Sequence, residues 1–112
     1  DGAVPKGDVL AVARIAGIQG AKKCAELLPL AHVIGVHGAS VDLAVQDGGV
    51  AIEATVRTAD RTGVEMEALT AVTIAALSVV DMVKGMDRSA TIENARIVAK
   101  TGGRSGSWTR EA

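Results

Sequence analysis

Two groups of charged residues lie at either end of a long stretch that is otherwise almost entirely apolar. Glu65 and Glu67 stand near its start, and Asp81 and Lys84 stand near its end. Positioned carboxylates and lysines can transfer protons, and a lysine also neutralises phosphate oxygens. A helix that only packed against a core would not need charged groups at both ends, so this pattern favours a site for a charged, phosphorylated substrate.

The spacing of the two groups limits how a single site could use both. If residues 63–86 form one helix, the sixteen residues from Glu65 to Asp81 span about 24 Å along its axis. One small substrate would not reach both ends of the same straight helix. We therefore expect a homo-oligomer, in which one end from one subunit meets the other end from a neighbour.

These residues also have explanations that involve structure alone. Asp81 and Lys84 stand three positions apart and could form an ordinary surface ion pair. Thr62 as N-cap and Glu65 at the third helical position could form a capping box, and Glu67 could be a favourable first-turn anion. Spacing alone leaves both interpretations open.

An earlier helix is predicted over residues 7–28. Asp8 is a suitable N-cap, and Pro29 marks the end. Small residues recur at four-residue spacing on this segment and would let another backbone approach closely: Ala13, Gly17 and Ala21.

Strands are predicted over 32–46 and 50–60, joined by a turn at 47–49, with His37 as an ordinary strand residue. Residues 50–57 alternate between apolar and polar or small side chains, which is typical of a sheet with one covered face. After the helix at 63–86, residues 91–99 are expected to form a further strand.

The resulting order of elements is α-β-β-α-β. One strand in front would complete a ferredoxin-like β-α-β-β-α-β unit, so we predict an α+β fold with an antiparallel sheet and two helices on one face. Residues 1–112 are expected to form a single domain. A missing first strand would fit a chain that begins with Asp1 and not with Met. The segment 101–112 is expected to be a flexible tail.

Composition excludes several classes of function. The net charge is −1, and the chain has one Trp and no Phe or Tyr, which argues against nucleic-acid binding. With no signal peptide or membrane-length apolar run in view, we expect a cytoplasmic protein.

Cys24 lies in an apolar stripe and is expected to be a buried, unreactive thiol. The histidines and the cysteine lack metal-ligand spacing, and no nucleotide-binding glycine motif occurs, so no metal or cofactor is predicted.

Six segments carry a family resemblance when they are taken in order. They are Lys6-Gly7-Asp8-Val9, Ala13 to Ile18, Leu28-Pro29-Leu30 with His32, Thr62 to Ala71, Asp81-Met82 with Lys84, and Ala99 to Gly103. Together they resemble the molybdenum-cofactor biosynthesis protein C family, the cyclic pyranopterin monophosphate synthases. The similarity runs across nearly the whole chain.

The resemblance implies a ferredoxin-like subunit in a hexamer of three dimers, with active sites at the dimer interfaces. The implied lyase reaction converts (8S)-3′,8-cyclo-7,8-dihydroguanosine 5′-triphosphate into cyclic pyranopterin monophosphate and diphosphate. That reaction rebuilds a purine-derived ring system and closes a cyclic phosphate. Each step moves protons near a highly charged group, for which lysines are suited.

The resemblance also implies roles for individual residues. Lys84 would act as general acid and base, Asp81 would orient it, and Lys6 would be a second essential lysine. The pterin side of the site would be lined by His32, Glu65, Met66 and Glu67. Lys100 and Arg104 would contact the phosphates.

The chain departs from the family pattern beside His32. Cys and Pro commonly flank this histidine, whereas the neighbours here are Ala31 and Val33. These changes could loosen the pocket. The alternative function is therefore a catalytically degenerate paralogue that acts as an oligomeric binding or regulatory module.

Overall fold

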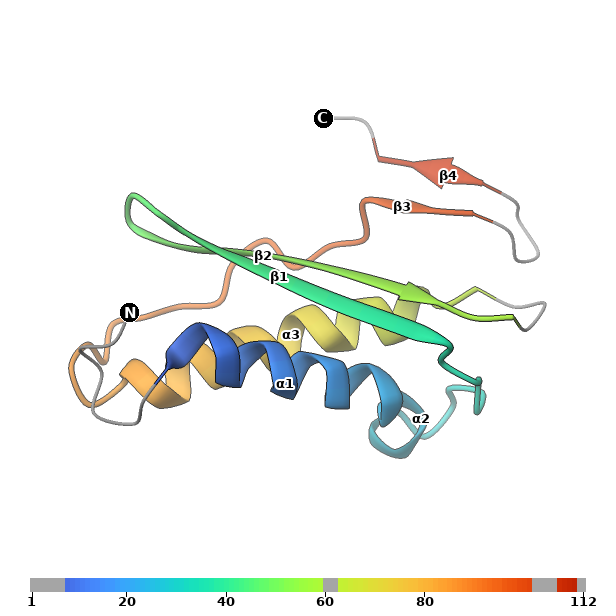
Figure 1. Cartoon of the computed structure of the whole chain (residues 1–112), viewed down its shortest axis with the longest axis horizontal. Helices are drawn as coiled ribbons and strands as arrows, with labels where there is room; N and C mark the ends of the chain where they lie inside the picture. Colours follow the sequence, from blue (N-terminus) through green and yellow to red (C-terminus); the bar gives the residue numbers. More distant parts are fainter. Residues whose placement is uncertain (1–7, 60–62, 102–106, 111–112) are drawn as a thin grey trace.

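In the computed structural model, a β-hairpin lies across two long helices, which both cover one face of the sheet (Figure 1). The structure describes residues 8–59, 63–101 and 107–110. The elements are α1 (Val9–Lys22), α2 (Cys24–Leu27), β1 (Gly38–Gln46), β2 (Gly49–Arg57), α3 (Glu65–Val83), β3 (Ala99–Lys100) and β4 (Trp108–Thr109). The predicted α+β class is confirmed.

The first helix begins as the sequence predicts but ends earlier. The Asp8 carboxylate accepts a hydrogen bond from the Ala11 N–H at 3.1 Å, which confirms the N-cap. The predicted continuous helix over 7–28 is wrong, because Lys23 leaves helical geometry at φ −105° and ψ 11°. Its N–H donates to the carbonyls of both Gln19 and Gly20, which tightens the last turn and separates α1 from α2. Residue 7 lies outside the described residues.

Small side chains bring α1 and α3 close together. A Cβ atom at Gly17 would lie only 3.0 Å from the Ala71 carbonyl oxygen and 3.0 Å from Val41 Cγ2. Four alanines at this contact are at most 1% exposed: Ala13, Ala21, Ala71 and Ala75. The predicted ridge of small residues is therefore confirmed as a helix-packing surface.

The hairpin turn occurs where the sequence predicts it. Gln46 pairs with Gly49, and Gly48 adopts a positive φ of 82°, a conformation that glycine accepts without strain. The predicted strands 32–46 and 50–60 are too long, because residues 32–37 and 58–59 are not in a strand; residue 60 lies outside the described residues. Beyond the Gly38–Arg57 pair, the chain leaves the antiparallel ladder.

Side-chain hydrogen bonds replace the ladder at that end of the hairpin. The Thr58 hydroxyl donates to the Gly35 carbonyl at 2.6 Å, and the Ala59 N–H donates to His37 Nδ1 at 3.1 Å. His37 thus joins two loops, and its prediction as an ordinary strand residue is wrong.

The long apolar helix is shorter than the predicted 63–86. Val64 occupies the N-cap position and makes no side-chain cap, and Glu65 is the first helical residue. The predicted capping box placed Glu65 at the third helical position and is therefore wrong. Thr62 lies outside the described residues. The helix ends at Val83, and the chain continues into a turn.

The predicted strand over 91–99 is also wrong: Ala99 alone of that range is in a strand, the two-residue β3 that it forms with Lys100. Asn94 has a φ of 58°, which interrupts an extended backbone. β3 pairs with β4 rather than with β2. β4 lies within the segment 101–112, and residues 102–106 and 111–112 of this segment are outside the described residues.

The turn after α3 is closed by Asp87. Its carboxylate accepts hydrogen bonds from the Ser89 hydroxyl at 2.5 Å and from the Ser89 N–H at 2.9 Å. Both hydrogen bonds lower the pKa of Asp87 from its usual 3.8, and the bond from the Ser89 hydroxyl has the larger effect. Because the pKa of Asp87 is lower in the folded state than in the unfolded state, its carboxylate stabilises the fold at pH values above the unfolded-state pKa of 3.8. This stabilisation is lost as the pH falls through the pKa of the folded state.

The Gly17 contact predicts a large difference between two identical substitutions. Gly17→Val should lower the free energy of unfolding by about 1–3 kcal/mol, because the new side chain overpacks the α1–α3 contact. Gly85→Val is the matched control, since no atom lies within 4 Å of a Cβ built there. It should change stability by no more than about 0.5 kcal/mol in urea denaturation. Equal effects at both positions would contradict the close contact.

The Asp87 turn predicts a measurable titration shift. Ser89→Ala should raise the pKa of Asp87 toward 3.8 while leaving it somewhat lowered, because the backbone hydrogen bond remains. Carboxyl carbon shifts followed by NMR from pH 2 to 6 would report the change. Thr91→Val removes a hydroxyl that donates to Glu93, so it should leave the Asp87 titration unchanged. An unchanged pKa in Ser89→Ala would contradict the assigned cause.

Candidate functional site

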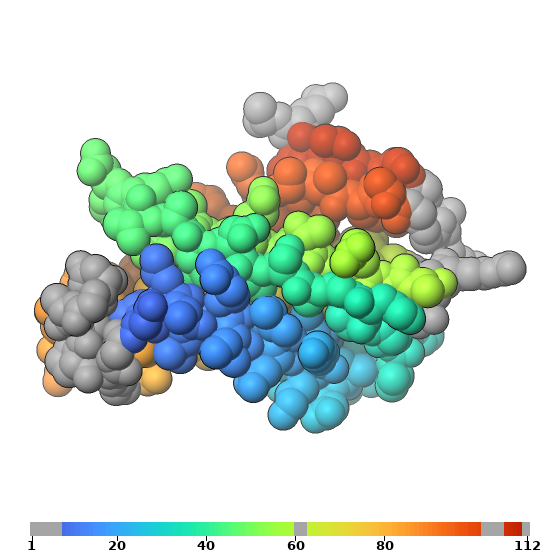
Figure 2. Space-filling model, in the orientation of Figure 1, coloured from blue at the N-terminus to red at the C-terminus, as the bar shows by residue number. Residues whose placement is uncertain are grey.

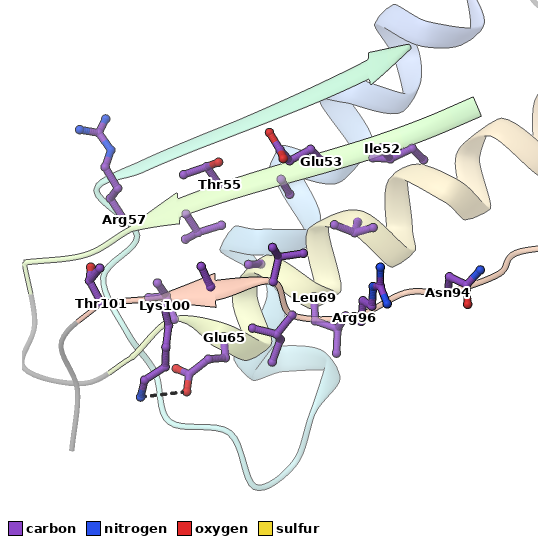
Figure 3. Close-up of a pocket in the computed structure, with 18 residues that line it drawn as sticks. Ile52, Glu53, Thr55, Arg57, Glu65, Leu69, Asn94, Arg96, Lys100 and Thr101 are labelled. Atoms are coloured by element: carbon purple, nitrogen blue, oxygen red, sulfur yellow. Dashed lines mark ion pairs between the residues drawn. The ribbon is translucent and has the colours of Figure 1, made fainter. Parts of the chain in front are cut away.

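An ion pair joins the start of α3 to β3. Lys100 Nζ lies 3.3 Å from Glu65 Oε2, and the side chains are 13% and 31% exposed, respectively (Figure 3). Glu65 is the first residue of α3, where the helix dipole favours a carboxylate. Lys100 is positioned by its strand pairing with Trp108. The pair is therefore partly withdrawn from water and held by two different elements.

A cavity of about 580 Å³ adjoins this ion pair. It lies between β2, the first half of α3 and the segment 94–101. Arg96 and Asn94 face it from the C-terminal segment, whereas Arg57, at the end of β2, points away from the ion pair (Figure 3). Lysine and arginine side chains around a cavity of this size suit an anionic ligand.

A second acid–lysine pair stands at the other end of α3. Lys84 Nζ donates to the Asp81 carboxylate and, at 2.8 Å, to the Asp81 carbonyl oxygen. The Lys84 and Asp81 side chains are 54% and 61% exposed. This geometry agrees with a role for Asp81 in orienting Lys84, and equally with a surface ion pair.

The other residues singled out from the sequence lie on different sides of the chain. His32 is exposed in the loop before β1, Met66 is 41% exposed, and Glu67 is 3% exposed. Successive helical residues differ by about 100° in direction, which separates Glu65, Met66 and Glu67. Lys6 and Arg104 lie outside the described residues. Of the singled-out residues that the structure describes, Glu65 is paired with Lys100, and Asp81 is paired with Lys84.

Sequence reasoning missed Arg96 and the Glu65–Lys100 pair. Arg96 lies in a segment that was predicted to be a regular strand, and a single arginine in such a strand does not indicate a binding site. Glu65 and Lys100 are 35 positions apart, so no local spacing rule connects them. Only the folded chain brings the two together.

Comparison with known proteins places these residues in a family context. The MoaC family model matches residues 1–103. A cyclic pyranopterin monophosphate synthase of Streptomyces coelicolor is 64% identical over 107 residues, which cover 96% of this chain and 63% of the relative. A protein of the same name from Nocardioides sp. is 59% identical over 96% of this chain and 68% of its own length.

A more distant relative also covers most of the chain. Cyclic pyranopterin monophosphate synthase 2 of Mycobacterium tuberculosis is 53% identical over 97% of this chain and 65% of its own length. The chain thus spans slightly less than two thirds of the Streptomyces and Mycobacterium relatives. Because the family model and these identities extend over nearly the whole chain, the chain belongs to the MoaC family.

Proposed function

We propose that this chain is a subunit of a cyclic pyranopterin monophosphate synthase, a lyase of molybdenum cofactor biosynthesis. The reaction would convert (8S)-3′,8-cyclo-7,8-dihydroguanosine 5′-triphosphate into cyclic pyranopterin monophosphate and diphosphate. The observation that carries the proposal is that α3 presents an acid–lysine pair at each end. Relatives named for this activity, at 53–64% identity, support it.

The two pairs suit different parts of the reaction. Lys84 is exposed and bonded to Asp81, so it would exchange protons with a substrate that reaches the end of α3. Lys6 would act as the second essential lysine. Lys100, with Arg104, would hold phosphate oxygens. Glu65 would accept hydrogen bonds from the N–H groups of the guanine-derived ring. The resemblance also assigns His32, Met66 and Glu67 to the pterin side, and in one subunit they lie on different sides of the chain.

The separation of the pairs supports an oligomer with shared sites. About 24 Å along α3 divides Glu65 from Asp81, so a small substrate would need the two ends from different subunits. Apolar side chains left exposed on the helices would suit such contacts: Val12, Ile15, Met66 and Leu77. We therefore favour a hexamer built as a trimer of dimers. A nucleotide-derived substrate favours a cytoplasmic location.

The arrangement of the elements supports a ferredoxin-like unit. Both long helices cover one face of the hairpin, and the segment 91–100 runs in the same direction as β2 (Figure 1). The order of the longest elements, α1, β1, β2 and α3, is compatible with a split β-α-β-β-α-β unit from its first helix to its second.

The proposal predicts that Lys84 is required for turnover. The purified protein would be incubated with the cyclic dihydroguanosine triphosphate intermediate, and product and diphosphate would be followed by mass spectrometry. Lys84→Ala should reduce turnover by about 10²–10⁴-fold, as expected for the loss of a positioned acid–base group. Lys22→Ala removes an exposed lysine in the last turn of α1 and should retain activity.

Assembly would be checked for each variant by light scattering. An assembled wild-type protein that forms no product would overturn the proposed activity and favour the catalytically degenerate paralogue. Full activity in Lys84→Ala would instead remove this lysine from the mechanism.

A further inference from the structure

The loop before β1 is held against the end of β2 by three hydrogen bonds. The His37 N–H donates to the Arg57 carbonyl at 2.8 Å, and the Thr58 hydroxyl donates to the Gly35 carbonyl at 2.6 Å. The third bond runs from the Ala59 N–H to His37 Nδ1 at 3.1 Å. We call these three bonds the loop junction. In Figure 2 its two segments, teal and yellow-green, lie side by side at the surface.

One atom of the loop junction has two neighbours that make opposite demands on it. His37 Nδ1 lies 3.1 Å from the Ala59 nitrogen and also 3.1 Å from the Gly35 carbonyl oxygen. The Ala59 N–H can donate only to an Nδ1 that has no proton, whereas the Gly35 carbonyl can accept only from an Nδ1 that carries one. The proton on Nδ1 therefore determines which of the two bonds forms.

The two bonds connect different parts of the chain. With its proton on Nε2, the neutral ring accepts from Ala59 and ties the loop to the chain after β2. The protonated ring has a proton on both nitrogens, so it donates to Gly35 within its own loop, and the Ala59 N–H loses this acceptor. The Gly35 carbonyl has two lone pairs, so it can accept from the ring and from Thr58 together. Histidine side chains ordinarily change charge between pH 5 and 8.

The charges around the loop junction add to this effect. Within residues 31–38 and 57–59, the titratable and charged side chains are His32, His37 and Arg57. The Arg57 guanidinium lies beside the loop, because a Cβ atom at Gly38 would be 2.9 Å from its Nε. Neither of the ion pairs between described residues involves His37. Protonation thus places a second positive charge beside Arg57 and weakens the contact between the two segments.

The loop junction connects two parts of the proposed site. His32 precedes His37 by five positions in the same loop, and Ala59 precedes Glu65 by six positions. Under the proposed function, His32 and Glu65 both contact the ring system of the substrate. Opening the loop junction therefore displaces groups that bind the substrate, although His37 itself need not touch it.

We propose that His37 is a positioning residue that makes the placement of these groups depend on pH. The neutral ring holds the loop to the chain after β2, and the protonated ring releases it by exchanging Ala59 for Gly35. Because Nδ1 must be unprotonated, the bond to Ala59 is present at the upper end of the range from pH 5 to 8 and is lost toward its lower end. The effect on turnover rests on the proposed function, whereas the exchange of hydrogen bonds does not.

The variant His37→Asn separates the hydrogen bond from the titration. Its side-chain oxygen stands as many bonds from Cα as Nδ1 does, and it accepts a hydrogen bond at every pH. Amide exchange of Ala59 would be followed by NMR, and each rate would be divided by the rate in His37→Asn at the same pH. This ratio should be near one at pH 8 and rise about three- to tenfold by pH 5, as expected for the loss of one neutral hydrogen bond. In His37→Ala the ratio should be raised equally at both pH values.

The ring itself would be measured in the wild-type protein. NMR shifts of the ring carbons report the fraction protonated, and this fraction should rise in step with the exchange ratio. Ring nitrogen shifts should place the proton of the neutral form on Nε2. This measurement needs no variant, so it tests the exchange of bonds even if a substitution impairs folding.

Turnover tests the positioning role. The value of kcat/KM in the wild type, divided by that in His37→Asn, should be near one at pH 8 and fall about three- to tenfold by pH 5. Groups that titrate in both proteins cancel in this ratio. His37→Ala should show a ratio below one that does not change with pH.

Two results would overturn the proposal. A proton on Nδ1 in the neutral ring, or an Ala59 exchange ratio that does not change with pH, would exclude the exchange of bonds. A changing exchange ratio with a constant kcat/KM ratio would reduce His37 to a structural residue. A wild-type protein that forms no product would instead refute the proposed function, and the exchange ratio would still test the loop junction.

Discussion

The close contact at Gly17 is the constraint on which the rest of the structure depends. At this point α1, α3 and β1 meet so closely that a Cβ atom at Gly17 would lie 3.0 Å from both the Ala71 carbonyl oxygen and Val41 Cγ2. The chain has no Phe or Tyr, so bulky rings cannot fill a wide space between the layers. Small residues instead bring the backbones together, and the core is the alanine and valine cluster of Ala21, Val41, Ala71 and Ala75.

This contact determines which surfaces of α3 remain for other uses. With α1 on one side and β2 on another, the helix leaves apolar side chains such as Leu69 and Val72 to line the cavity beside β2. Its length separates its charged ends, so that Glu65 meets Lys100 while Asp81 meets Lys84. The same rigid element therefore connects the core and both candidate parts of the active site.

Much of the architecture follows from local sequence patterns. The Asp8 cap, the hairpin turn at Gly48, the small-residue ridge of α1 and the long apolar helix all depend on neighbouring residues, and all were predictable. The α+β class followed from their order. The Asp81–Lys84 pair was predictable as well, because three-residue spacing on a helix brings side chains together.

The errors occur where distant contacts override local preference. Residues 91–98 have a strand-like composition, but Asn94 interrupts the extended backbone and β2 does not pair with them. The hairpin ends early because Thr58 and Ala59 bond to the loop at Gly35 and His37. The Glu65–Lys100 pair depends on how α3 and β3 meet, which no spacing rule in one sequence reveals.

Subunit complementation tests most directly whether the two ends of α3 form one site across two chains. Lys84→Ala and Glu65→Gln proteins, each impaired alone, would be unfolded, mixed in equal amounts and refolded together. In a mixed dimer, one of the two sites would contain both native residues, so random mixing should restore about a quarter of wild-type turnover. No gain in activity from mixed oligomers of confirmed composition would contradict a shared site.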